Sequence, residues 1–182
     1  MRIIAGTYRS RKLNTLAGEN TRPTQDKIKE AIFSSLGAYF HGGKMLDLFA
    51  GSGSMGLEAL SRGMDKIYLN DHQRSAIKVI QSNIEILKAE KECVVSCLDY
   101  MSMLKKVRED KFDLIFLDPP YANKVLEECL YFIEENDMLE VEGYLILESS
   151  NEDIFKENYH SFTKVKEKVY GITRITYYRK EF

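Results

Sequence analysis

The sequence predicts an α/β fold with a mainly parallel seven-stranded sheet that ends in an antiparallel hairpin. Three observations lead to this prediction. From residue 44 to about residue 149, short apolar runs alternate with amphipathic segments. A glycine-rich turn follows the first apolar run, as in sheets that bind a ligand above their strand ends. Residues 162–180 then change to two segments in which polar and apolar side chains alternate, which is typical of a hairpin.

Residues 1–43 are expected to form a small N-terminal extension of β-turn and helix, a basic hairpin followed by a helix. Residues 2–5, RIIA, predict a short strand, and a turn that contains glycine and arginine follows. Residues 21–36 predict a helix that Thr24 can cap. Its apolar stripe consists of Ile28, Ala31, Ile32 and Leu36.

Residues 44–182 are expected to form the main domain, in which strands and helices alternate. The expected parallel strands cover residues 45–50, 66–70, 92–98, 112–118 and 144–149. The expected helices cover residues 54–63, a segment around 77–87, residues 100–108 and residues 123–136. The hairpin strands, residues 162–170 and 173–180, join near Gly171 at the sheet edge. This order predicts a sheet that is covered by helices on both faces.

The composition indicates an ordinary globular protein, with 44% apolar and 30% charged residues. No run approaches the roughly 20 apolar residues of a membrane helix, and the first residues lack a signal-peptide core. We therefore expect a cytoplasmic protein without membrane contact. A monomer is a separate expectation. The three cysteines, Cys93, Cys97 and Cys129, contain no CxxC pair. We expect three buried thiols without a disulfide, and no metal site.

Charge is distributed unevenly along the chain. Residues 1–44 contain eight lysine and arginine residues against three acids, while the whole chain has a net charge of −2. A basic segment attached to an acidic body is typical of a protein that docks a polyanion at one end. A solvated surface without a partner would have the same composition, so charge alone leaves both interpretations open.

A glycine loop between the first strand and the next helix predicts a nucleotide-type ligand. Gly51, Gly53 and Gly56 form the pattern G-x-G-x-x-G, and Asp71 lies at the tip of the following strand. Glycine permits a tight turn and a close approach of the backbone to the ligand, and Asp71 is placed to bind ribose hydroxyls. This pattern alone also suits a dinucleotide.

Asp47 favours S-adenosylmethionine over a dinucleotide. It precedes Gly51 by four residues, on the strand beneath the loop, and a carboxylate close to a pyrophosphate would be unfavourable. S-adenosylmethionine instead has an ammonium group and a sulfonium, and its own carboxylate can face the helix N-terminus. Asp99, after the third strand, is expected near the adenine ring, although it could equally cap the next helix. Phe49 and Ser52 of the loop, and Asp118, complete the predicted cofactor site.

The fourth strand ends in the sequence Asp118-Pro119-Pro120-Tyr121, which predicts a catalytic turn. If the acceptor is an exocyclic amine of a nucleobase, Asp118 and the Pro119 carbonyl can each accept one of its hydrogens and hold the nitrogen for attack. The prolines stiffen the turn, and Tyr121 can stack on a base that has left its helix. An ordinary strand-terminating turn is the alternative, but the position beyond the carboxyl end of a strand favours a ligand site.

These blocks resemble the small bacterial methyltransferases that modify N2 of a guanine in 16S ribosomal RNA, those of the guanine(966)-N(2) type. The segments RIIAGTYRSRKL, TRPTQDKIKEAIFSSL, LDLFAGSGSMGLEALSRG and FDLIFLDPPY occur in the order and spacing of that family. The resemblance implies a Rossmann-like methyltransferase fold and S-adenosylmethionine as cofactor. It implies cofactor contacts at Asp47, Gly51, Gly53, Asp71 and Asp99, and catalysis at Asp118, Pro119, Pro120 and Tyr121.

The resemblance also implies that Arg9, Arg11, Lys12 and Arg22 face 16S rRNA, within a 30S subunit or an assembly intermediate. The chain departs from the family pattern at two places. It has Asp71 where glutamate is more common, and Leu98 where a glycine usually precedes the acid.

Two other functions share these motifs. A DNA adenine-N6 or cytosine-N4 methyltransferase would use the same tip at Asp118, but such enzymes usually carry a larger region that reads sequence. A catalytically silent RNA-binding module would not need the intact acid and prolines.

Overall fold

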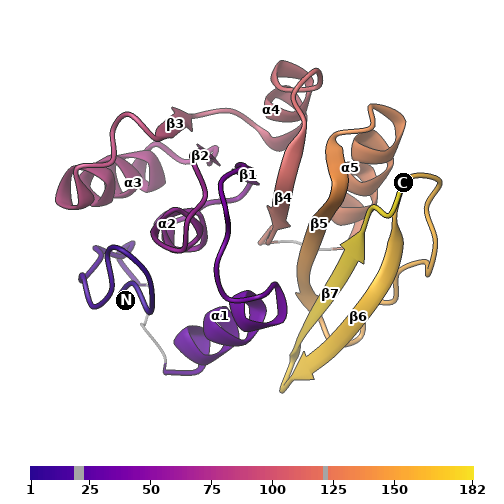
Figure 1. Ribbon diagram of the computed structural model, residues 1–182, viewed down its shortest axis with the longest axis horizontal. Coiled ribbons are helices and arrows are strands. Elements are labelled where there is room, and N and C mark those ends of the chain that lie inside the picture. Colours follow the sequence, from indigo (N-terminus) through magenta and orange to yellow (C-terminus); the bar gives the residue numbers. More distant parts are fainter. Residues whose placement is uncertain (19–22, 121–122) are drawn as a thin grey trace.

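The computed structural model describes residues 1–18, 23–120 and 123–182 (Figure 1). In chain order, the elements are α1 (Pro23–Ser35), β1 (Lys44–Asp47), α2 (Ser54–Ser61), β2 (Lys66–Asn70), α3 (Arg74–Leu87), β3 (Cys93–Ser96), α4 (Tyr100–Lys106), β4 (Phe112–Leu117), α5 (Asn123–Glu135), β5 (Leu139–Ser150), β6 (Thr163–Tyr170) and β7 (Thr173–Arg179).

The sheet has the predicted α/β architecture. Its strand order is β3-β2-β1-β4-β5-β7-β6, and β1 to β5 pair in parallel. The C-terminal strands pair antiparallel, with β7 beside β5 and β6 at the edge. The order reverses between the neighbouring strands β1 and β4, and ligands of such sheets bind at this point, beyond the carboxyl ends of the strands.

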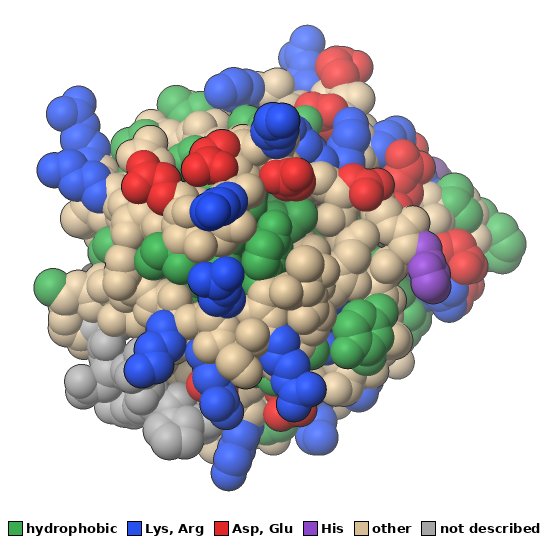
Figure 2. Space-filling view, turned by 60° about the vertical axis from the view of Figure 1, so that its left-hand side comes forward, with side chains coloured by type: hydrophobic (Ala, Val, Ile, Leu, Met, Phe, Trp, Pro, Cys, Tyr) green, Lys and Arg blue, Asp and Glu red, His purple; other side chains and the backbone are tan. Residues whose placement is uncertain are grey.

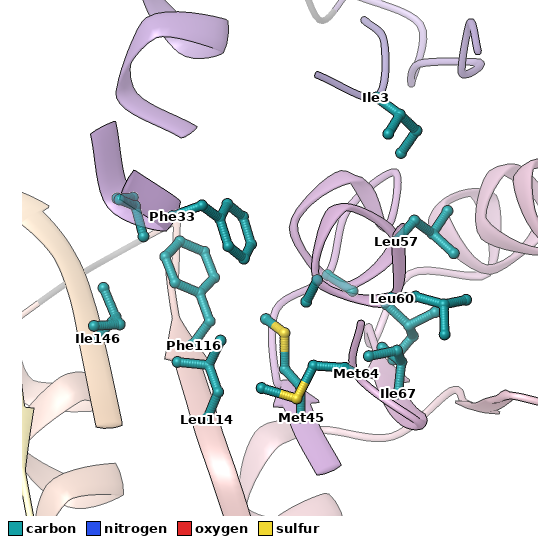
Figure 3. Close-up of a cluster of buried hydrophobic side chains, with 14 of the residues drawn as sticks. Ile3, Phe33, Met45, Leu57, Leu60, Met64, Ile67, Leu114, Phe116 and Ile146 are labelled. Atoms are coloured by element: carbon teal, nitrogen blue, oxygen red, sulfur yellow. The ribbon is translucent and has the colours of Figure 1, made fainter. Parts of the chain in front are cut away.

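Two apolar cores cover the two faces of the sheet. One core packs α1, α2 and α3 on residues such as Met45, Leu114, Phe116 and Ile146, and the other packs α4 and α5 on the opposite face. In Figure 3, Phe33 of α1 lies against Phe116 of β4. Because strand side chains alternate between faces, this packing determines which residues at each strand end face α1.

The N-terminal segment differs from its prediction. Residues 2–5 do not form a strand, and only an isolated antiparallel bridge joins Arg2 to Lys12. The segment is held instead by long-range contacts, because the backbone N–H groups of Ile4 and Ala5 donate to the Glu58 carboxylate of α2 at 2.9 and 3.1 Å. Figure 1 shows residues 1–18 beside α2, at the end of the molecule away from the hairpin.

Three smaller predictions also need correction. Helix α1 begins at Pro23, so that Thr24 lies inside it and not at its cap, in keeping with the preference of proline for the first helical position. Strand β5 begins at Leu139 rather than at residue 144. Of the three thiols, Cys129 is buried, whereas Cys93 is half-buried and Cys97 is exposed.

The N-terminal extension and the main domain share one core. Ile3, Leu13, Ile32 and Phe33 belong to the same apolar cluster as the strands of the main domain. The division at residue 43 remains a prediction. No helix among the described residues is long and apolar enough to cross a membrane.

Candidate active site

A cavity of about 650 Å³ lies at the carboxyl ends of the central strands. Strand ends, the glycine loop and one side of α1 form its walls. Nine residues of the predicted site line it: Asp47, Phe49, Gly51, Ser52, Asp71, Asp99, Asp118, Pro119 and Pro120. Segments that are far apart in the sequence therefore meet at one hollow, as the parallel sheet predicted.

Two glycines of the loop are required by its geometry. Gly53 adopts the left-handed conformation, with φ of 81°, at the N-cap of α2, a conformation that glycine adopts at little cost. A Cβ atom at Gly56 would lie 2.6 Å from Leu69 Cδ2 and 2.7 Å from Ile67 Cγ2. Gly56 thus permits α2 to pack closely on β2, and the N-terminus of α2 opens toward the cavity.

Asp47 is buried at the base of the cavity with one oxygen unpaired. Its Oδ2 accepts a hydrogen bond from the Gly56 backbone N–H at 3.1 Å. Its Oδ1 is buried and has no hydrogen-bond partner among the described residues. Burial raises the pKa of Asp47 to about 7, a net value that includes the opposing Gly56 hydrogen bond and a smaller upward contribution from the neighbouring Asp71. Such a group favours a ligand that brings a positive charge or a donor.

Asp71 stabilises the glycine loop as well as lining the cavity. Its Oδ2 accepts from the Gly51 backbone N–H at 3.0 Å, and its Oδ1 accepts from the Gln73 backbone N–H at 2.9 Å. The side chain is 14% exposed. Carboxylate oxygens have more than one acceptor direction, so these bonds are compatible with the predicted contact to hydroxyls, which remains a prediction.

Asp99 is the N-cap of α4. Its Oδ1 accepts from the Ser102 backbone N–H at 3.0 Å, and its contacts with Ser102 lower the pKa of this exposed carboxyl. The cap and the cavity position coexist, because Asp99 and the following Tyr100 both line the hollow. The Tyr100 ring lies 5.9 Å from the Phe49 ring, so the cavity has a partly aromatic wall here.

Sequence reasoning missed Asn70, which joins three strand ends. Its Nδ2 donates to the carbonyls of Leu48 and Leu98 at 3.1 and 3.0 Å, and its Oδ1 accepts from the Leu98 N–H at 3.2 Å. Asn70 is buried and holds the loops after β1 and β3 at a fixed separation. The sequence indicates this role of Asn70 only by an asparagine at the end of a predicted strand. An asparagine at this position is equally typical of an ordinary turn.

Strand β1 separates the turn after β4 from Asp71, which follows β2. Asp118 and Pro120 are exposed, whereas Pro119 is buried, and all three contribute to the cavity wall. Tyr121 falls outside the described residues. The structure therefore brings the turn and the glycine loop to one cavity, and the stacking role of Tyr121 remains a prediction.

The predicted RNA-facing residues form part of the outer surface. Arg9, Arg11 and Lys12 are exposed and do not line the cavity, and Arg22 lies outside the described residues. Figure 2 shows basic side chains gathered on the lower part of one face, whereas the upper part mixes both signs.

A buried ion network that sequence reasoning missed connects the N-terminal segment to the cavity. Glu58 is fully buried and pairs with Lys29 at 3.3 Å and with Arg62 at 2.9 Å. Lys29 lines the cavity and also donates to the Arg2 carbonyl at 2.8 Å. Burial lowers the pKa of Lys29, although Glu58 opposes this shift.

Comparison with known proteins identifies relatives that extend over nearly the whole chain. The Bacillus subtilis protein YlbH, provisionally named an rRNA methyltransferase, is 41% identical over 182 residues, which cover 99% of each chain. Ribosomal RNA small subunit methyltransferase D of Haemophilus influenzae is 35% identical over 98% of this chain and 93% of its own. The solved structure of YhhF from Escherichia coli, provisionally described as a methyltransferase, is 32% identical, with a TM-score of 0.85 and coverage of 100% and 98%.

The sheet order, the glycine loop and these structural relatives define a Rossmann-like methyltransferase fold. The family described as Conserved hypothetical protein 95 matches residues 1–179. The chain belongs to this family, together with the proteins named ribosomal RNA small subunit methyltransferase D. The family predicted from the sequence blocks is thereby confirmed.

Proposed function

We propose that this protein methylates the exocyclic N2 amine of a guanine in 16S ribosomal RNA, after the base has left its helix and entered the cavity. The observation that carries this proposal is that one cavity contains both the buried, unpaired oxygen of Asp47 and the turn Asp118-Pro119-Pro120. The unpaired oxygen of Asp47 suits a cationic cofactor, and the turn at Asp118 suits a methyl acceptor that is an amine.

The family assignment makes the chain an S-adenosylmethionine-dependent rRNA methyltransferase. The cavity residues fit this cofactor. Asp47 offers an unpaired carboxylate oxygen for an ammonium group, and the N-terminus of α2 offers backbone donors for a carboxylate. Asp71, Asp99 and the ring of Phe49 would hold the nucleoside part. When bound, S-adenosylmethionine supplies a methyl group on an electrophilic sulfonium.

The residues of the β4 turn would hold the acceptor amine. The lone pair of a guanine N2 is delocalised into the ring, so the nitrogen is a poor nucleophile while it stays planar. Asp118 and the Pro119 carbonyl would each accept one N2 hydrogen, and both contacts would favour the pyramidal nitrogen of the transition state. The N2 lone pair would form its bond to the methyl carbon while the bond between that carbon and the sulfur breaks and its electron pair stays on sulfur, and one N2 proton would then leave toward Asp118 or solvent.

Exposed Arg9, Arg11 and Lys12 would bind rRNA phosphates outside the cavity. Phosphate contacts fix the position of the RNA, whereas contacts inside the cavity select the base. The 30S subunit or an assembly intermediate is the proposed form of the substrate, and a monomer is the proposed form of the enzyme. The proposed compartment is the cytoplasm, where the ribosome is assembled.

A methyl-transfer assay with labelled S-adenosylmethionine tests this function. Three substrates are compared: 16S rRNA without modifications, 30S subunits that lack them, and duplex DNA. We expect transfer to the rRNA or to the subunits, and none to DNA. Transfer to adenine or cytosine of DNA would favour the alternative function, and RNA binding without transfer would indicate a silent binding module.

A further inference from the structure

We propose that Glu148 is a specificity-determining residue that recognises guanine. Its carboxylate would accept a hydrogen bond from the guanine N1–H, while Asp118 holds the adjacent N2 amine. This inference rests on the proposed function and adds to it the group that distinguishes guanine from other bases. Glu148 was not among the residues predicted from the sequence. It lies near the end of β5, at a position where strand alternation alone would give an ordinary polar residue.

The register of the sheet places Glu148 next to the catalytic turn. In the parallel pairing of β4 with β5, Leu117 lies beside Leu147. Asp118 and Glu148 each follow one of these paired residues, and they are therefore neighbours across the two strands. Both residues line the same cavity.

Strand alternation places the two side chains on one face of the sheet. Phe116 and Ile146, two residues before Asp118 and Glu148, belong to the core that packs against α1, and Figure 3 shows both on this side. Residues i and i+2 of a strand share a face. Glu148 therefore faces the part of the cavity that α1 closes, where Ile28 and Ile32 form an apolar wall.

Within the part of the chain that the structure describes, the backbone of Glu148 pairs with β7, whereas its side-chain carboxylate makes no hydrogen bond or ion pair. Lys29 is a cation in the same cavity wall, but it is paired with Glu58 at 3.3 Å. Partial burial raises the pKa of Glu148, because the charged form loses water without gaining a protein donor. A ligand that brings an N–H donor would stabilise this carboxylate.

The Watson–Crick edge of guanine supplies the donors that match. It presents the N1–H and the two hydrogens of the N2 amine, whereas adenine and cytosine present a ring-nitrogen acceptor at the corresponding place. Asp118, the Pro119 carbonyl and Glu148 are three acceptors for these three hydrogens. A ring-nitrogen acceptor would face the Glu148 carboxylate without a proton between them, and a buried polar group left unpaired in this way gives strong discrimination.

The test uses a base in which an acceptor replaces the N1–H of guanine while the N2 amine is kept. After the target position is mapped with the wild-type enzyme, 30S subunits are reconstituted with guanine or with 2,6-diaminopurine at that position. 2,6-Diaminopurine keeps the N2 amine but has an acceptor at N1. We expect wild-type kcat/KM to be at least about tenfold higher for guanine.

Glu148→Gln supplies the decisive comparison. Its amide N–H can donate to the acceptor N1 of 2,6-diaminopurine, so we expect its preference for guanine to shrink by about tenfold or more. Glu148→Asp keeps the carboxylate and should keep the preference. Glu152→Gln, which makes the same charge change at an exposed position after β5, is the matched control and should behave as wild type. S-adenosylmethionine affinity and the melting temperature, measured for each variant, verify the fold.

Equal losses on both bases in Glu148→Gln would overturn the inference, because a merely structural residue would affect both alike. An unchanged preference for guanine would overturn it as well, and would leave the proposed function intact. If the wild-type enzyme methylates no guanine of the 16S rRNA in 30S subunits, both the proposed function and this inference are wrong.

Discussion

Among single residues, Asp47 has the environment that most clearly calls for a ligand. A fully buried carboxylate with an unpaired oxygen is unfavourable unless a charge or a donor compensates it. Its neighbour Gly56 satisfies one oxygen, and no described residue satisfies the other. The raised pKa, about 7, expresses the same imbalance. We therefore interpret Asp47 as a residue retained for binding at a cost in stability.

Asp47→Asn should separate binding from stability. We expect it to weaken S-adenosylmethionine binding tenfold or more, since a charge-assisted hydrogen bond contributes about 1.5–3 kcal/mol. The unliganded protein should become more stable at pH 8, on the order of 1 kcal/mol, because the variant no longer buries a charge. Titration calorimetry and thermal unfolding of the unliganded protein measure the two effects. Unchanged affinity would remove Asp47 from the cofactor site.

The pH dependence of cofactor binding follows from the same group. The folded-state pKa of Asp47 lies above its ordinary value of 3.8. The folded state is therefore favoured at low pH, and this contribution is lost as the pH rises through about 7. The ammonium needs the ionised carboxylate, so wild-type affinity should increase from about pH 6 to about pH 8. This increase should be absent in Asp47→Asn, and an identical pH profile would contradict the assignment.

Asp118→Ala should remove most methyl transfer while the fold and cofactor affinity stay near wild type. Its proposed contact strengthens as the nitrogen becomes pyramidal, so the loss should occur in kcat at saturating RNA, by about 10²-fold or more. Single-turnover methylation of unmodified 30S subunits measures this loss directly. Wild-type kcat in Asp118→Ala would contradict the proposal that this residue holds the amine.

Tyr121 provides the matched comparison for Asp118. Tyr121→Ala should weaken capture of the flipped base by about 1–3 kcal/mol, the usual contribution of a stacking ring. Tyr121→Phe should be nearly silent, because the proposal uses the ring and not the hydroxyl. Equal damage in the two variants would show that the hydroxyl has a role of its own.

Among the elements, the N-terminal segment and α1 form a unit that connects the outer surface to the cavity. Glu58 receives the backbone N–H groups of Ile4 and Ala5 and pairs with Lys29 of α1. Ile3 packs toward α2 in Figure 3. The exposed Arg9 and Arg11 are thus attached to the helix that lines the cavity, so RNA bound at the segment would be held at a defined place relative to the site.

Charge reversal at Arg9, Arg11 and Lys12 should raise the KM for RNA and flatten the salt dependence of RNA binding. Binding then neutralises fewer phosphates and releases fewer counterions, so the slope decreases by about 0.7–0.9 for each phosphate that is no longer neutralised. Filter binding at several salt concentrations measures this slope, and cofactor affinity should stay unchanged. Reversal at Lys105 and Arg108, exposed residues in and after α4 on the opposite face, is the control. An unaltered slope in the first variant would mean that the segment is a solvated surface.

In the molecule as a whole, the features of the fold that depend on local sequence patterns could be predicted from the sequence. Hydrophobic periodicity determines whether a segment forms a strand or a helix, and parallel strands bring their carboxyl ends to one edge. The glycine loop and the turn at Asp118 could therefore be predicted to meet at that edge. The hairpin at the sheet edge followed from the change to an alternating pattern at the end of the chain.

Features that depend on contacts between distant residues could not be predicted in this way. Glu58 belongs to a helix whose sequence pattern is amphipathic. Only the fold shows that the Glu58 side chain is fully buried against Lys29 and Arg62. Asn70 joins loops from three strands, and the neighbour relation of Asp118 and Glu148 depends on the register of β4 and β5. Residues 2–5 have strand-like composition, but among the described residues they pair with no strand and form one bridge, from Arg2 to Lys12.

The chemical identity of the product tests the proposed function most directly. The purified protein is incubated with S-adenosylmethionine and 30S subunits that lack rRNA modifications, and the recovered 16S rRNA is digested to nucleosides for mass spectrometry. N2-methylguanosine should appear at about one per subunit, and Asp118→Ala should abolish it over the same interval. A methylated adenosine or cytidine, or a guanosine methylated at N1 or N7 in place of N2, would contradict the proposed function.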